Sequence, residues 1–65
     1  MIKEEHIYSG SGGIYVVTSD NEGELKTYLE AKQKGIDFMR SPYILGISQL
    51  PSGEYKGQLK YYGLD

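Results

Sequence analysis

One stretch of the chain, residues 20–35, constrains the fold most, because it carries signals for both ends of a single helix. Ser19, Asp20 and Asn21 are alternative N-caps, since each side-chain oxygen can accept a hydrogen bond from a free amide of the first turn. At the other end, Gly35 is expected to adopt the left-handed conformation that terminates many helices. The sequence therefore predicts one helix that is complete within this stretch.

The apolar stripe of this helix is short. Leu25, Tyr28 and Leu29 share one face, which Ile36 continues just beyond the helix end. Ile36 is also expected to fold back onto Ala31. Lys32 falls on the same stripe, so its stem is expected to lie along apolar surface while its ammonium group reaches water. A stripe of this size cannot hold an isolated helix together in water. The helix must therefore pack on a sheet.

Four segments on either side of the helix have the composition of strands, with β-branched and aromatic residues enriched and turn residues at their ends. The first of them alternates imperfectly and is rich in charge, which is typical of an edge strand. Gly46 in the third predicts either a bulge or a close approach of another backbone segment. The four segments are 2–8, 14–18, 43–50 and 55–62.

The connections differ in character. Residues 9–13 are expected to form a flexible five-residue loop between the first two strands. Pro51 and Gly53 predict a tight turn, because proline presets its first corner and glycine tolerates a positive φ. In the connector 37–42, Phe38 and Met39 are expected to be core anchors.

Pro42 has a further local consequence, because the residue before a proline is pushed towards extended geometry; this residue is Ser41. With the connections placed, the element order is β-β-α-β-β. This order predicts a small two-layer α+β domain, residues 1–65, with an antiparallel sheet and one helix on one of its faces. The order of the strands in the sheet stays open.

The size and composition of the chain limit the classes of protein to which it can belong. The chain has 65 residues, 38% of them apolar, and no cysteine, so its core is small and lacks a disulfide staple. Dimerisation therefore remains open. The net charge of −2 argues against broad neutralisation of a nucleic-acid backbone. No apolar run indicates a signal peptide or membrane span, and we expect a cytoplasmic accessory protein of bacterial or phage type.

Three features resemble sites of chemistry, and a structural interpretation is favoured for each. Gly10, Gly12 and Gly13 resemble a phosphate loop, but they lead into a strand instead of a helix, and no lysine follows. The acidic run 20–24 fails the ligand spacing of a calcium-binding loop at both ends. His6 is the only histidine. We therefore expect no enzyme, cofactor or metal site.

Tyrosine is the informative excess, with seven residues against one phenylalanine and no tryptophan. Tyrosine is enriched at protein-binding hot spots, and the last strand combines it with lysine. We therefore expect a protein partner to bind through a tyrosine-rich sheet face or edge. The alternative is single-stranded nucleic acid, with bases stacked on the rings and phosphates held by lysine. The expected binding residues are Tyr43, Tyr55, Lys56, Lys60, Tyr61 and Tyr62.

Overall fold

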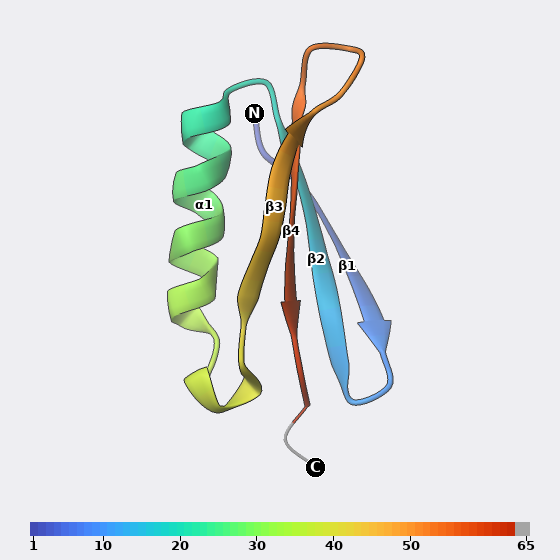
Figure 1. The fold of residues 1–65 in the computed structure, drawn as a ribbon, viewed down its shortest axis with the longest axis vertical. Helices are drawn as coiled ribbons and strands as arrows, with labels where there is room; N and C mark the ends of the chain where they lie inside the picture. Colours follow the sequence, from blue (N-terminus) through green and yellow to red (C-terminus); the bar gives the residue numbers. More distant parts are fainter. Residues whose placement is uncertain (64–65) are drawn as a thin grey trace.

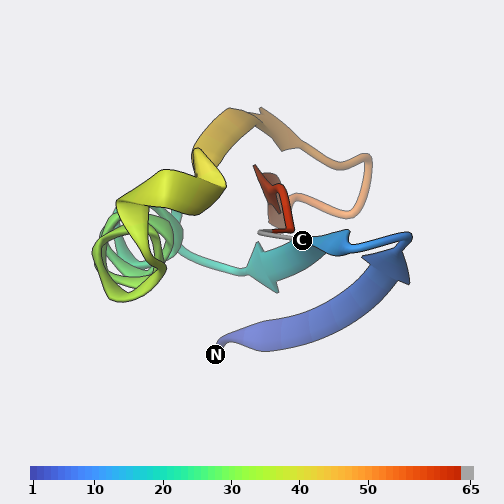
Figure 2. The ribbon, with the colours of Figure 1, turned by 90° about the horizontal axis from the view of Figure 1, so that it is seen from below.

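The elements follow the predicted order in the computed structural model, which describes residues 1–63. They are β1 (Lys3–Ser9), β2 (Gly12–Ser19), α1 (Glu22–Gly35), the 3-10 helix η1 (Phe38–Arg40), β3 (Tyr43–Gln49) and β4 (Tyr55–Tyr61). The strands form one antiparallel sheet in the order β1-β2-β4-β3, and α1 packs on one of its faces (Figure 1, Figure 2). The predicted α+β class is confirmed. The last strand of the chain is central, and β1 and β3 form the edges.

The core lies between α1 and the two central strands. Four hydrophobic side chains are fully buried: Val17, Leu25, Leu29 and Leu59. Partly buried residues surround them, namely Ile2, Tyr15, Tyr28, Ile36, Ile44, Ile47 and Tyr55. The stripe predicted for the helix is thus the one that packs on the sheet. The helix comes so close to β4 that a Cβ atom at Gly57 would lie 2.5 Å from Cδ1 of Leu29.

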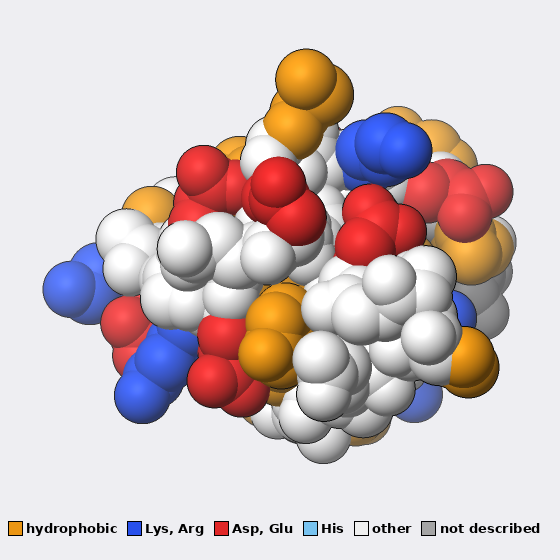
Figure 3. Space-filling model, turned by 90° about the horizontal axis from the view of Figure 1, so that it is seen from above, with side chains coloured by type: hydrophobic (Ala, Val, Ile, Leu, Met, Phe, Trp, Pro, Cys, Tyr) orange, Lys and Arg blue, Asp and Glu red, His pale blue; other side chains and the backbone are white. Residues whose placement is uncertain are grey.

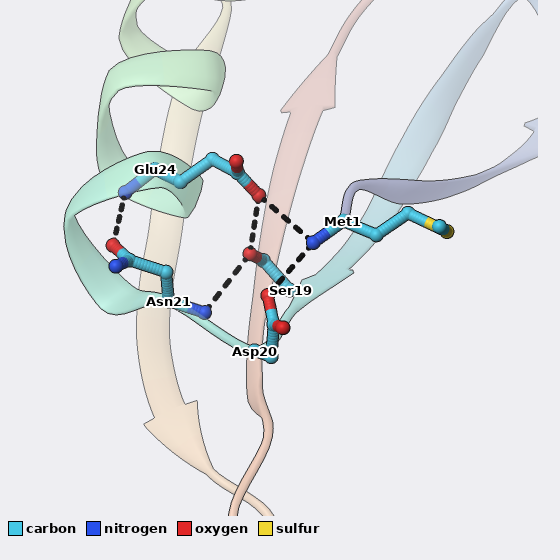
Figure 4. A network of polar contacts seen from close by, with 5 residues as sticks. All are labelled: Met1, Ser19, Asp20, Asn21 and Glu24. Carbon is cyan, nitrogen blue, oxygen red and sulfur yellow. Dashed lines mark hydrogen bonds and ion pairs between the residues drawn. The ribbon is translucent and has the colours of Figure 1, made fainter.

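The helix begins in a network of hydrogen bonds, shown in Figure 4. Asn21 is the N-cap, and its Oδ1 accepts from the backbone N–H of Glu24 at 2.8 Å. Ser19 is fully buried at the end of β2; its Oγ accepts from the backbone N–H of Asn21 at 3.1 Å and donates to Oε1 of Glu24 at 2.8 Å. Of the three candidate caps, Asn21 is therefore the N-cap. Ser19 belongs to β2, and its hydroxyl group supports the first turn of the helix.

This end of the molecule is acidic. Figure 3 looks down on it and shows Asp and Glu side chains gathered across the start of the helix. The ammonium group of Met1 lies 2.7 Å from Oδ1 of Asp20 and 3.3 Å from Oε1 of Glu24. Its hydrogen bond to Asp20 lowers the pKa of that carboxyl group. Negative charge here also suits the positive end of the helix dipole.

The helix ends differently from the prediction. Gly35 is the last helical residue and has no positive φ, so the left-handed cap predicted there is wrong. Instead Ile36 is extended, with φ −95° and ψ 136°, and its N–H donates to the carbonyl of Gln33 at 3.3 Å. Ile36 packs against the core in this extended conformation.

The connector after the helix also departs from expectation. Phe38 and Met39 are 84% and 66% exposed, so their assignment as core anchors is wrong. The 3-10 turn that contains them is fixed by polar contacts, since Oδ1 of Asp37 accepts from the N–H of Met39 at 3.0 Å. Ser41 takes a left-handed conformation, with φ 50° and ψ 52°, where extended geometry was expected. This conformation closes the turn, because its N–H donates to the Phe38 carbonyl at 3.0 Å.

The first hairpin is tighter than predicted. Ser9 pairs with Gly12, so the turn consists of Gly10 and Ser11 only, and a positive φ of 62° at Gly10 fits a type II′ turn. The five-residue loop is therefore wrong. Gly13 belongs to β2, where it pairs with Tyr8 and Tyr61. A side chain there would clash, since a Cβ atom would lie 2.7 Å from the hydroxyl oxygen of Tyr61.

Two glycines take the roles that the sequence predicts. The register of β3 against β4 shifts between Ile44 and Gly46, and Gly46 has a φ of 140°, which confirms the bulge. Gly53 has a φ of 94° in the turn that follows Pro51.

Within residues 1–63, α1 is too short and too polar to cross a membrane, and no other helix is longer.

Candidate protein-interaction surface

One face of the sheet carries the helix; among residues 1–63, no other element packs on the opposite face, which we call the open face (Figure 2). Side chains alternate between the two faces of a strand, so the register assigns each residue to a side. The open face is formed by Lys3, Glu5 and Ile7 of β1, Ile14, Val16 and Thr18 of β2, Lys56, Gln58 and Lys60 of β4, and Tyr43 and Ser48 of β3.

Two tyrosines stand side by side at one end of the open face. The ring centroids of Tyr43 and Tyr62 are 6.3 Å apart with an angle of 29° between the ring planes. Lys60, which pairs with Tyr43 across the strands, places its Nζ 5.4 Å from the Tyr62 centroid. The interaction with Tyr62 raises the pKa of the Tyr43 hydroxyl. Both rings are partly exposed, at 37% and 49%, and present a preformed aromatic surface.

A hollow lies near the other end of β3, beside the bulge. Gly46 borders it and has no side chain to fill it. The lining of the hollow also includes Leu45, Leu50, Lys56 and Gln58. The hollow thus has apolar walls beside an ammonium group and an amide.

The charge of the open face is opposite to that of the whole chain. It carries three lysines, Lys3, Lys56 and Lys60, against one acid, Glu5, although the net charge of the protein is −2. The acidic groups gather elsewhere, notably at the helix start seen in Figure 3. Such a separation of charge favours partners that are acidic at the contact.

The six residues expected to bind a partner do not all share one surface. Four of them, Tyr43, Lys56, Lys60 and Tyr62, come together on or beside the open face. Tyr55 and Tyr61 point to the helix side, where Tyr55 packs against the core and Tyr61 is only 8% exposed. Because β4 is central, strand addition at the last strand is excluded. Side chains along β4 alternate as expected, but only the packing of α1 shows which side of the strand is covered.

Tyr61 instead joins an aromatic cluster on the helix side of β1 and β2. Its hydroxyl lies 2.6 Å from Nε2 of His6, and the His6 ring stacks on Tyr15 with centroids 4.1 Å apart. Tyr8 completes the cluster at 4.2 Å from the His6 centroid. No local pattern in the sequence indicates that His6 contacts Tyr61, because the two residues are 55 positions apart. The cluster ties the edge strand β1 to the central strands.

A charged network beside this cluster links β1 to the helix. Nζ of Lys32 lies 2.6 Å from Oε1 of Glu4 and 4.1 Å from the centroid of the Tyr15 ring. The ammonium group is thus engaged within the protein, contrary to the expectation that it reaches water. Tyr28 donates from its hydroxyl to Oε1 of Glu4 at 2.6 Å. The hydrogen bonds from Lys32 and Tyr28 lower the pKa of Glu4.

Replacing Glu4 with glutamine is expected to lower the free energy of unfolding by about 1 kcal/mol at pH 7, because the ion pair with Lys32 is lost. Since the folded-state pKa of Glu4 is lowered, its contribution is complete above the unfolded pKa and is lost as the pH falls below about 4. Urea unfolding of both proteins at pH 7 and near pH 3 measures this. A difference in stability that does not change with pH would contradict the assignment.

Within residues 1–63, the structure brings together no group of three or more His, Cys, Asp or Glu side chains that could hold a metal ion. Comparison with protein-family models, with curated proteins and with solved structures finds no match to this chain. The open face therefore has to be interpreted from its own chemistry.

Proposed function

We propose that this protein is a small, non-enzymatic interaction module of the accessory, adaptor or inhibitor type, and that it binds a protein partner on its open face. The observation that carries the proposal is the exposed pair of Tyr43 and Tyr62 with Lys60 beside it. No enzymatic step enters the proposal, because binding alone accounts for these features.

The tyrosine pair supplies the binding energy expected of such a site. Tyrosine offers a large contact area, loses little conformational entropy and keeps a hydroxyl group for hydrogen bonds. Contact with Tyr43 limits the freedom of the Tyr62 ring before any partner arrives. A partner that covers both rings therefore loses less entropy on binding than one that must order them.

The charges and the hollow indicate what the partner presents. Lys56 and Lys60 favour carboxylates, and the hollow beside Gly46 has room for an aliphatic side chain. We therefore propose an acidic segment with an aliphatic residue as the contacting part of the partner. Lys56 borders the hollow, so a carboxylate next to that residue would be held at the same point.

Single-stranded nucleic acid is the second candidate, and the same face gives it one specific observation. Two rings, Tyr43 and Tyr62, could each stack a base, which is worth about 1–3 kcal/mol per base, and three lysines could hold phosphates. Two features favour protein over nucleic acid. The tyrosines already contact each other, and the net charge of the chain is −2.

Capture of partners from a bacterial lysate, with and without nuclease, followed by affinity measurement with the purified partner, tests the proposal. Tyr62→Ala is expected to weaken that affinity about tenfold or more, because it removes an anchor of the contact. Tyr8→Ala is the matched control, since Tyr8 is 76% exposed on the helix side of the sheet. A protein complex that responds equally to both substitutions would exclude the open face.

Titration of a labelled oligothymidylate tests the second candidate. Contacts from Lys3, Lys56 and Lys60 to three phosphates would give a loss of affinity of roughly 20-fold between 50 and 200 mM salt. The proposal of a protein partner would give way to nucleic acid if the oligonucleotide binds with this salt dependence and if the captured partners disappear after nuclease treatment. Absence of binding to the oligonucleotide would support the protein partner.

A further inference from the structure

We propose that the free edge of β3 pairs with β3 of a second copy of this chain in antiparallel orientation, which joins the two sheets into one continuous sheet. The inference concerns the sheet edge and goes beyond the partner proposed for the open face. It begins from a difference between the two edge strands.

The two edges are protected to very different degrees. β1 contains Lys3, Glu4 and Glu5 within its seven residues, and charged side chains on an edge discourage further pairing. β3 is also seven residues long but has no charged residue, and five of its residues are exposed. It is hydrogen-bonded to β4 on one side only. The bulge at Gly46 interrupts the β3 edge at one point, but no charge protects it. The sheet thus has one edge guarded by charge, β1, and one edge without charge, β3, which we call the unguarded edge.

Exposed apolar side chains concentrate at the unguarded edge. Among residues 1–63, eight large hydrophobic side chains are exposed, and five of them lie in β3, in the turn that precedes it, or against its first residue. These five are Phe38, Met39, Tyr43, Leu45 and Tyr62. Apolar exposure gathered along one edge is typical of a surface that is covered in the assembled protein.

The distribution of charge on α1 favours a second copy as the occupant. The helix packs against β3 and runs antiparallel to it, with Glu22 and Glu24 in its first turn and Lys34 in its last (Figure 1). A two-fold axis beside β3 would place the two helices antiparallel on the same face of the joined sheet. The acidic start of each helix would then lie towards the basic end of the other, which favours this pairing.

Because the core of one copy is small, burial of further apolar surface between two copies would favour assembly. Only four hydrophobic side chains are fully buried among the described residues, so a single copy buries little apolar surface. Antiparallel pairing would add main-chain hydrogen bonds along β3 and cover apolar surface at Leu45, while Tyr43 and Tyr62 stay on the open face for the partner. The β3 sequence has no charged residue, so no like charges meet when the strand pairs with itself.

Sedimentation of the purified chain, without partner or nucleic acid, tests the proposal. We expect twice the mass of one chain at concentrations up to about 0.3 mM, with dissociation on dilution. Leu45→Lys places a charge on the β3 edge and is expected to raise the dissociation constant at least tenfold. Ile7→Lys is the matched control on β1, because Ile7 and Leu45 are 46% and 48% exposed. It should leave the dimer intact.

Two results would overturn the inference: a wild-type protein that is monomeric over the whole range, or a dimer that Ile7→Lys dissociates and Leu45→Lys does not. Circular dichroism establishes that each variant is folded. Ser48→Lys, at another exposed position of β3, should dissociate the dimer in the same way. The outcome is independent of the partner experiment, since mass is measured on the isolated chain and the partner test compares Tyr62→Ala with Tyr8→Ala.

Discussion

Replacing Leu29 with alanine is expected to lower the free energy of unfolding by about 3 kcal/mol, which is a large part of the stability of a domain of this size. Leu29 is fully buried and lies where the helix meets the sheet, over Gly57. Truncation removes apolar contacts and leaves a cavity that two rigid elements cannot close. Urea unfolding followed by circular dichroism measures the loss.

Thr27→Ala provides the comparison on the same helix. Thr27 is exposed, so its replacement should change the free energy of unfolding by no more than about 0.5 kcal/mol. If the Leu29→Ala protein loses less than about 1 kcal/mol relative to wild type, the helix does not pack on the sheet as described.

Replacing Gly57 with alanine is expected to lower the free energy of unfolding by about 2 kcal/mol, although it adds only one methyl group. The new Cβ atom would lie 2.5 Å from Cδ1 of Leu29 and 3.3 Å from Cγ1 of Ile47, so the fully buried Leu29 side chain has to leave its position or the helix has to shift. A strand normally gains from alanine in place of glycine, because glycine loses more conformational entropy on folding. At this position the cost of the clash with Leu29 exceeds the stability gained from the lower conformational entropy of alanine in the unfolded chain.

The two substitutions should compensate each other, which makes the prediction specific to this contact. Leu29→Ala removes the Cδ1 atom that the new methyl group would strike. In the Leu29→Ala background, Gly57→Ala should therefore cost less than about 0.5 kcal/mol, with a coupling energy of about 1 kcal/mol or more. Strictly additive losses in the four-protein cycle would contradict the close approach of helix and strand.

The candidate surface could be predicted from the sequence only in part. Alternation along β4 correctly groups Lys56 and Lys60 with Tyr62, because side chains alternate whatever the strand pairs with. The same pattern sets Tyr61 apart from them. It does not say which group the helix covers. The packing of α1 on the face that carries Val17 and Leu59 decides that, and it places Tyr61 on the helix side, where its hydroxyl contacts His6.

By itself, the sequence determined those features that depend on neighbouring residues. The helix, its buried stripe, the bulge at Gly46 and the turn at Gly53 follow from capping, periodicity and backbone sterics within a few positions. Only the tertiary structure decided the features that depend on distant contacts. It ordered the strands, left Phe38 and Met39 at the surface, and kept the open face uncovered. The physical reason is that burial depends on what packs against a residue, and that contact comes from another part of the chain.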